Sequence, residues 1–208
     1  MPLVGIPKRD ASIKLEGSTR PFEGKGAAFL DRDGVINDNV FVNDPDDLVL
    51  LPGAEKAIAR LNRAGIPVVV VTNQGGLAMG YLTESTLAEI HAKLANLLAE
   101  DGAHVDAIYY CPHMPNAMVA AYRQQCSCRK PEIGMLERAR DDLGVDLSAS
   151  VLVGDSTSDI LAGIRAGCRT ILVRTGFGGA DGKVSAQPDE VADDIADAVD
   201  RILTVPLA

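Results

Sequence analysis

Short runs of apolar residues recur along the chain at intervals that a helix can fill. Five of these runs are continuous rather than alternating, and they cover residues 27–30, 68–71, 107–110, 151–153 and 170–173. A strand covered on both faces carries such a continuous run, whereas a strand with one face in water alternates apolar and polar residues. We therefore predict five buried strands.

Between these runs, apolar residues return with the three- and four-residue spacing of a helix. The spacing predicts helices over Ala54–Arg63, Thr83–Glu100, Ile133–Leu143, Asp159–Ala166 and Pro188–Leu203. Glycines that can end the first four helices stand at positions 65, 102, 144 and 167. Because repeated strand–helix–strand units need crossover connections, we predict an α/β fold with a doubly wound, Rossmann-like parallel sheet.

Two stretches lack this periodicity. Residues 1–24 mix glycine, proline and charges, and we expect them to form an N-terminal tail or an edge extension. The remaining residues, 25–208, are expected to form a single domain. Residues 175–187 hold four glycines without the spacing of a phosphate-binding loop, which favours a flexible surface loop.

Composition narrows the possible partners. The 208 residues are 47% hydrophobic and 24% charged, which is enough apolar material for one sizeable core. A formal charge of −9 opposes binding to nucleic acid or to anionic membranes. No apolar run approaches the roughly 20 residues of a membrane span, and the first residues lack a secretory pattern. We expect a soluble, cytoplasmic protein, and a monomer because no heptad pattern is present.

Polar residues follow three of the predicted strands. Asp31, Arg32 and Asp33 follow the first, Thr72, Asn73 and Gln74 follow the second, and Asp155 follows the fourth. The carboxyl ends of parallel strands share one edge, where ligands bind, so these residues are predicted to converge there. If the chain stays extended, Asp31 and Asp33 project to the same side and Arg32 points away.

Three aspartates at one edge point to a cation. Close carboxylates repel one another, and a divalent ion bound by Asp31, Asp33 and Asp155 would keep them ionised. Ligands that are all oxygen favour Mg²⁺. Whether Asp159 contributes to this site is left open by the sequence. Any one of these aspartates alone is explained as a turn or N-cap residue, whereas their convergence favours a site.

The order of these segments resembles the haloacid dehalogenase-like (HAD) phosphohydrolases over residues 27–175. The four segments similar to the family motifs are Asp31–Val35, Thr72–Gln74, Lys130–Pro131, and Gly154–Asp155 with Asp159. The resemblance implies a HAD-like fold and Mg²⁺-dependent hydrolysis of phosphate monoesters. It also implies that the chain has no cap domain, since neither usual insertion point holds enough residues.

The resemblance implies a role for each motif residue. Asp31 would be the nucleophile that forms an aspartyl-phosphate, and Asp33 would protonate the leaving oxygen and then activate water. Thr72, the Asn73 amide and Lys130 would hold the phosphoryl oxygens. Without the family, Thr72 is equally a strand end and Lys130 a surface lysine.

A second ligand cluster lies between residues 111 and 128. Three cysteines and one histidine, Cys111, His113, Cys126 and Cys128, match a closed Cys₃His zinc site. Four filled positions leave no opening for substrate, so we predict a structural Zn²⁺ that orders the loop before Lys130. The alternative is a set of reduced loop cysteines. Cys168 is expected to be a buried thiol, and His91 and His104 to be surface or helix-end residues.

The cysteine loop narrows the resemblance to capless enzymes such as the heptose-bisphosphate and histidinol-phosphate phosphatases. In these, Arg129 would contact a second anionic group of a sugar bisphosphate. The chain departs from the heptose-enzyme pattern at Gly75, Met79 and Ser156, where serine, arginine and lysine are common. These departures leave the identity of the small phosphorylated metabolite open.

Two other functions compete with a phosphatase. A receiver-like signalling module also gathers aspartates and a lysine around magnesium, but its aspartyl-phosphate persists. The presence of Asp33, placed to speed turnover, favours the enzyme. A zinc-stabilised binding module without catalysis is opposed by the complete set of acidic residues.

Overall fold

The computed structural model describes residues 12–14, 20–38, 41–205 and 207. The strands are β1 (Ser12–Lys14), β2 (Ala28–Leu30), β3 (Val68–Asn73), β4 (Ala107–Cys111), β5 (Val151–Gly154), β6 (Arg169–Val173) and β7 (Glu190–Ala192). The helices are α1 (Ala54–Arg63), α2 (Gly75–Met79), α3 (Glu84–Glu100), α4 (Gly134–Leu143), α5 (Thr157–Ala166) and α6 (Ile195–Thr204). Short 3₁₀ turns cover Pro45–Asp47, Ala120–Tyr122 and Leu147–Ala149.

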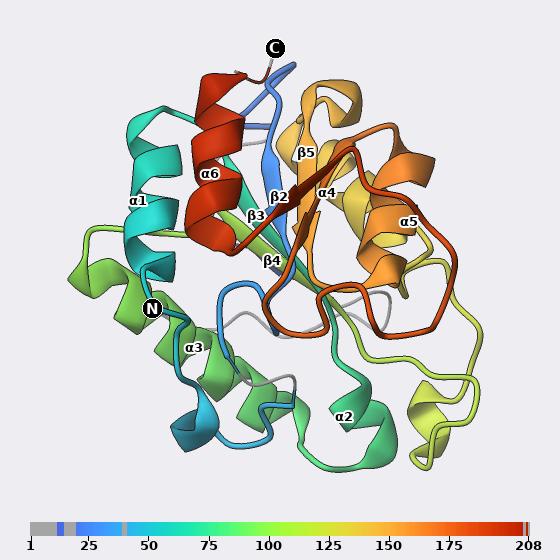
Figure 1. The fold of residues 1–208 in the computed structure, drawn as a ribbon. Coiled ribbons are helices and arrows are strands. Elements are labelled where there is room, and N and C mark those ends of the chain that lie inside the picture. The colour runs from blue at the N-terminus through green and yellow to red at the C-terminus, as the bar shows by residue number, and fades with distance from the viewer. Residues whose placement is uncertain (1–11, 15–19, 39–40, 206, 208) are drawn as a thin grey trace.

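The strands join into one sheet in the order β1-β4-β3-β2-β5-β6-β7 (Figure 1). From β4 to β7 all neighbours are parallel, while β1 pairs antiparallel with β4. The chain runs outward from β2 through β3 to β4 and then returns to β5 on the other side of β2. This reversal confirms the doubly wound prediction and places a ligand crevice beside the carboxyl end of β2.

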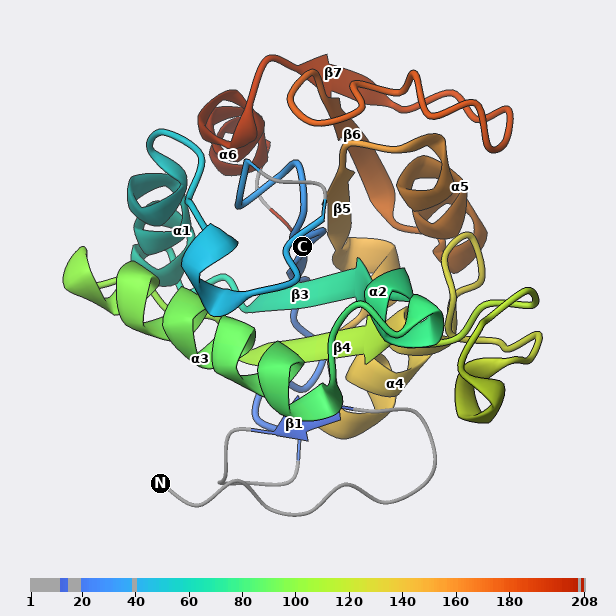
Figure 2. The same cartoon turned by 90° about the horizontal axis from the view of Figure 1, so that it is seen from below.

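Each central strand divides its side chains between two layers of helices. Leu30 and Val70 belong to the core packed under α1, α3 and α6, whereas Phe29 and Val69 belong to the core under α4 and α5. Figure 2 shows the two layers on opposite sides of the sheet. Because both faces of β2 and β3 are buried, the strands carry the continuous apolar runs that predicted them.

The predicted helix at Pro188–Leu203 starts seven residues too early. Residues 190–192 pair in parallel with β6 as strand β7, and α6 begins only at Ile195. Asp194 caps α6 by accepting a hydrogen bond from the Asp197 N–H at 2.9 Å. The Asp194 N-cap therefore marks the start of α6, whereas Pro188 precedes strand β7.

The other predicted helices lie close to their expected bounds. Gly144 and Gly167 end α4 and α5 in the left-handed conformation. Of the expected N-terminal tail, residues 12–14 form β1, while residues 1–11 and 15–19 lie outside the described part of the chain. No helix among the described residues combines the length and hydropathy that a bilayer crossing demands.

Candidate active site and second ligand cluster

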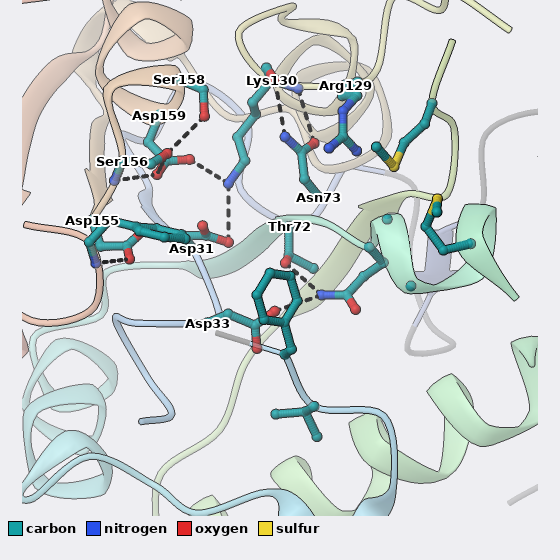
Figure 3. Close-up of a pocket in the computed structure, with 18 of the residues that line it drawn as sticks. Asp31, Asp33, Thr72, Asn73, Arg129, Lys130, Asp155, Ser156, Ser158 and Asp159 are labelled. Atoms are coloured by element: carbon teal, nitrogen blue, oxygen red, sulfur yellow. Dashed lines mark hydrogen bonds and ion pairs between the residues drawn. The ribbon is translucent and has the colours of Figure 1, made fainter. Parts of the chain in front are cut away.

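The motif residues meet at the carboxyl edge of three neighbouring strands. Asp31 follows β2, Thr72 and Asn73 end β3, and Asp155 follows β5, with β2 in the middle. A pocket of about 320 Å³ opens at this edge, and these four side chains line it together with Lys130 (Figure 3). The structure thus brings together residues that are up to 124 positions apart in the sequence.

Lys130 is held among carboxylates at the floor of this pocket. Its Nζ lies 3.1 Å from Asp31 Oδ1 and 2.6 Å from Asp159 Oδ1 (Figure 3). It also donates to the Val71 carbonyl at 2.6 Å. The lysine is buried, so it is not the solvated surface residue that the sequence allowed. Its ammonium is aimed directly at the proposed nucleophile.

The acidic residues of the site carry more negative charge than Lys130 neutralises. One oxygen each from Asp31, Asp155 and Asp159 lies within 4.8 Å of the others. Burial raises the pKa of Asp31 to about 6 against the opposing effect of Lys130, and Asp159 raises it further. Burial and the Asp31 charge raise the pKa of Asp155 to about 7. A divalent cation would relieve this repulsion, and the oxygen donors suit Mg²⁺.

The same carboxylates stabilise the charged form of Lys130. Burial alone would lower the pKa of its ammonium, but Asp159 and Asp31 outweigh burial and raise the pKa to about 12. The lysine is therefore fully charged at neutral pH. It can neutralise charge on a phosphoryl group without taking part in proton transfer.

Asp155 is seated between two glycines. A Cβ atom on Gly34 or Gly176 would lie 2.2 or 2.1 Å from Asp155 Oδ2, and both glycines have positive φ, 80° and 60°. Only glycine allows the two loops to close on this carboxylate. The Phe177 N–H also donates to Asp155 Oδ2 at 2.8 Å, which fixes its orientation.

Asp33 lies in a separate cradle. Arg32 folds back onto it, with Nη2 donating to Oδ1 at 2.7 Å and to Oδ2 at 2.9 Å. The predicted extended geometry ends here, because the Ile36 and Asn37 N–H groups both bond to the Arg32 carbonyl and turn the chain. Arg32 therefore does not point away, and Asp159, rather than the Asp33 carboxylate, completes the acidic cluster with Asp31 and Asp155 among the described residues.

Asn73 of the second motif is hydrogen-bonded to the main chain of Lys130 in the third motif. The Asn73 side chain donates to the Lys130 carbonyl at 3.0 Å and accepts from the Lys130 N–H at 3.1 Å. The Gln74 amide donates to Thr72 Oγ1 at 2.9 Å and to Asp33 Oδ2 at 3.0 Å. Since Thr72 Oγ1 accepts from Gln74, its own hydrogen is available to a ligand in the pocket.

The cysteine loop forms a second ligand cluster beside β3. Cys111 ends β4 next to Asn73, and its Sγ lies 3.0 Å from Cys128 Sγ and 3.5 Å from Cys126 Sγ. His113 Nδ1 lies 3.4 Å from Cys128 Sγ. The cysteines are free thiols. A tetrahedral zinc site has ligand edges of about 3.8 Å, so small outward shifts would admit the ion.

Arg129 links the cysteine loop to the pocket. Its Nη1 donates to the His113 carbonyl at 3.2 Å, and its side chain lines the pocket beside Lys130 (Figure 3). A side chain on Gly75 would meet Met114 Sδ at 3.0 Å and approach Arg129. The departure from serine at position 75 therefore leaves room for Met114.

The glycine-rich loop contributes residues that the sequence analysis missed. Residues 175–181 fold over the site, because the Gly179 N–H donates to the Asp155 carbonyl at 2.8 Å and Thr175 Oγ1 donates to the Gly34 carbonyl at 2.7 Å. Phe177 and Lys183 line the pocket, with Lys183 Nζ 5.2 Å from the Phe177 ring centre. The signal was available, since this loop directly follows β6 at the same sheet edge.

The remaining histidines and the fourth cysteine belong to neither ligand cluster of the described residues. Cys168 is buried, as expected. The prediction for His91 is wrong, because it is 3% exposed and packs against Tyr110 with ring centres 5.9 Å apart. His104 is exposed and lies 3.7 Å from Asp106. His91 sits on the buried side of α3, which the helical spacing alone did not reveal.

Known proteins resemble this chain in both sequence and structure. Residues 127–198 match the HAD-hydrolase-like family model. A relative from Haemophilus ducreyi named D-glycero-beta-D-manno-heptose-1,7-bisphosphate 7-phosphatase is 44% identical, over 74% of this chain and 85% of the relative. A relative from Thermosynechococcus vestitus named D-glycero-D-manno-heptose-1,7-bisphosphate 7-phosphatase is 43% identical over 86% of this chain and 95% of its own.

A solved structure extends the similarity to three dimensions. The D,D-heptose 1,7-bisphosphate phosphatase from B. bronchiseptica, complexed with magnesium and phosphate, superposes with a TM-score of 0.77. It is 40% identical to this chain, and the match covers 87% of this chain and 99% of the other.

Proposed function

The chain belongs to the HAD-like phosphatase family that contains the heptose-1,7-bisphosphate 7-phosphatases, and from this premise we propose that it removes the 7-phosphate of a heptose 1,7-bisphosphate. Hydrolysis of a phosphate monoester follows from the family. The substrate is supported by relatives with that name at 41–44% identity. The observation that carries the chemistry is Lys130, which joins Asp31 and Asp159 at the pocket floor.

Asp31 is the proposed nucleophile. One of its carboxylate oxygens attacks phosphorus and forms an aspartyl-phosphate while the ester oxygen leaves. The Lys130 ammonium, 3.1 Å from Asp31 Oδ1, faces the phosphoryl oxygens and offsets their charge. The Thr72 hydroxyl and the Asn73 N–H, at the end of β3, are placed to donate to the same oxygens.

Asp33 is the proposed proton carrier. It lines the same pocket but sits in its own cradle, apart from the cluster of Asp31 and Asp155. In the first step its proton passes to the leaving oxygen as the bond to phosphorus breaks. In the second step it accepts a proton from the water that attacks the aspartyl-phosphate, which frees phosphate and restores Asp31.

Mg²⁺ is the cofactor that the donor set fits. Asp31 and Asp155 would hold the ion, with Asp159 next to them. Burial first, and neighbouring carboxylates second, raise the pKa values of Asp31 and Asp155, and a bound cation would favour their charged forms. When bound, the ion neutralises the nucleophile and the phosphoryl oxygens. Zn²⁺ is the proposed occupant of the Cys111, His113, Cys126 and Cys128 cluster, where it would order the loop that carries Arg129.

The first test is phosphate release from heptose 1,7-bisphosphate, other sugar phosphates and histidinol phosphate, with Mg²⁺ and with a chelator. We expect the heptose ester to be turned over fastest and only with Mg²⁺. The variant Asp31→Asn should lose at least about 10³-fold in kcat and keep its fold, because Asp31 is the bond-forming group. Turnover close to wild type, with deamidation back to aspartate excluded by mass spectrometry, would contradict the proposal.

Arg129 is the proposed contact for the second phosphate. It carries a planar guanidinium at the pocket wall, bound on one side to the His113 carbonyl. We expect Arg129→Gln to raise KM for the bisphosphate about tenfold, which corresponds to the loss of one charge-assisted contact, while KM for a sugar monophosphate changes little. Equal changes for both substrates would show that Arg129 does not read the second phosphate.

A further inference from the structure

Arg32 lies between Asp31 and Asp33 in the sequence, and the proposed reaction uses only the two aspartates. Its side chain is 0% exposed. Burial of a guanidinium is costly, and well-packed apolar residues in place of a buried ion pair often give equal or greater stability. Stability alone therefore does not explain an arginine at this position.

Most hydrogen bonds of the Arg32 side chain go to the Asp33 carboxylate. Nε donates to Asp33 Oδ1 at 3.0 Å, and Nη2 donates to both carboxylate oxygens. Nη2 also reaches Gln74 Oε1 at 3.4 Å. Nη1 is buried and has no hydrogen-bond partner among the described residues. The guanidinium thus hydrogen-bonds both oxygens of Asp33 while one of its own nitrogens is left without a hydrogen bond among the described residues.

Two amides complete the cradle. Asn37 Nδ2 donates to Asp33 Oδ1 at 3.1 Å, and Gln74 Nε2 donates to Oδ2 at 3.0 Å. The Asp33 side chain is 15% exposed and borders the pocket, so one side of the carboxylate still faces substrate. With donors on both oxygens, the plane of the carboxylate is fixed relative to the pocket.

We propose that Arg32 is a positioning residue that fixes the Asp33 carboxylate for proton transfer to the leaving group. This inference rests on the proposed function, in which Asp33 protonates the leaving oxygen and later takes a proton from water. One oxygen of Asp33 must serve both steps from the same place. A planar fork of N–H donors fixes that place, whereas a lysine would supply charge without fixing the plane.

The test compares two leaving groups in the first turnover. One substrate is p-nitrophenyl phosphate, whose phenolate leaves without protonation, and the other is the alkyl phosphate turned over fastest in the screen above. Arg32→Met and Arg32→Lys should slow the first turnover of the alkyl ester at least tenfold more than the burst of p-nitrophenol. KM should change little, and Arg32→Met/Asp33→Asn should be no slower than Asp33→Asn alone.

The control is Arg60→Gln, which removes an exposed arginine that lies 2.6 Å from Asp200, away from the pocket. It should leave both substrates unaffected, and zinc content and thermal unfolding report the fold of every variant. Equal slowing of both substrates, full rescue by lysine, or failure of both Arg32 variants to fold would overturn the inference. If Asp33→Asn itself shows no dependence on the leaving group, the proposed role of Asp33 fails as well.

Discussion

The carboxylate cluster and the thiol cluster lie at the same edge of one sheet, yet they are built for different tasks. Asp31 follows β2 and Cys111 ends β4, with β3 between them. The carboxylates line a pocket, whereas the ligand atoms of the three cysteines and His113 lie within 4.8 Å of one another in a loop. Hard oxygen ligands with an open side leave room for substrate, while four soft ligands close a site.

The two clusters also differ in how the fold reaches them. The acidic groups come from two separate motifs, one after β2 and one after β5, and converge only because these parallel strands end together. The thiol cluster is nearly local, since residues 111 to 128 supply all four ligands. Damage to the thiol cluster should therefore act first on folding, and damage to the acidic cluster first on catalysis.

The largest effect should come from the thiol cluster. Cys128 is buried, and Cys128→Ser should release the zinc and lower the unfolding free energy by about 3–5 kcal/mol, roughly 10 °C in Tm. Metal analysis and calorimetry measure both. Cys168→Ala, at a buried thiol outside the cluster, should keep the zinc. A Cys128→Ser protein with full zinc content would show that the cluster does not hold the metal.

A smaller effect should follow from crowding Asp155. Gly176→Ala places a Cβ against Asp155 Oδ2 and should weaken Mg²⁺ binding at least about tenfold, without loss of zinc. Gly182→Ala is the matched control, since Gly182 also has positive φ in the same loop but has nothing within 4 Å of its Cβ position. If both variants weaken Mg²⁺ equally, backbone strain rather than the contact with Asp155 is responsible.

The smallest effect concerns pH. Asp31 and Asp155 have pKa values raised from 3.8 to about 6 and about 7, so the folded protein holds protons that the unfolded chain has lost. Without metal, stability should fall as pH rises from about 4 to about 7. Mg²⁺ must displace these protons at low pH, so its binding should be at least about tenfold tighter at pH 8 than at pH 6.

Thermal unfolding with and without Mg²⁺ measures this difference. A tenfold change in affinity is worth up to about 1.4 kcal/mol, or about 3–5 °C, at saturating Mg²⁺. Asp155→Asn should abolish most of the pH dependence of the Mg²⁺ effect. An equal gain in Tm at both pH values would argue against Asp31 and Asp155 as the ligands.

The sheet and the convergence of the motifs could be predicted because both follow from general rules. Continuous apolar runs identify strands buried on both faces, and parallel strands place their carboxyl ends together. The sequence therefore predicts that Thr72 and Asp155 lie at one sheet edge, and its local spacing predicts the grouping of Cys111, His113, Cys126 and Cys128. The burial of Lys130 could not, because lysine is usually exposed and only the neighbouring carboxylates make its burial favourable.

The differences between prediction and structure come from single turns and caps. The condition that the chain stays extended from Asp31 to Asp33 is not met, because the chain turns and directs Arg32 onto Asp33. The helix predicted to start at Pro188 begins only at Ile195, after the Asp194 cap. Such choices depend on contacts with distant segments, such as the pairing of β7 with β6, which periodicity does not contain.

The two hydrogen bonds between the Asn73 side chain and the main chain of Lys130 connect the two clusters mechanically. They connect the end of β3 to Lys130. The preceding residue, Arg129, is in turn hydrogen-bonded to the His113 carbonyl in the cysteine loop. A displacement of the cysteine loop would consequently be transmitted to the lysine that contacts Asp31.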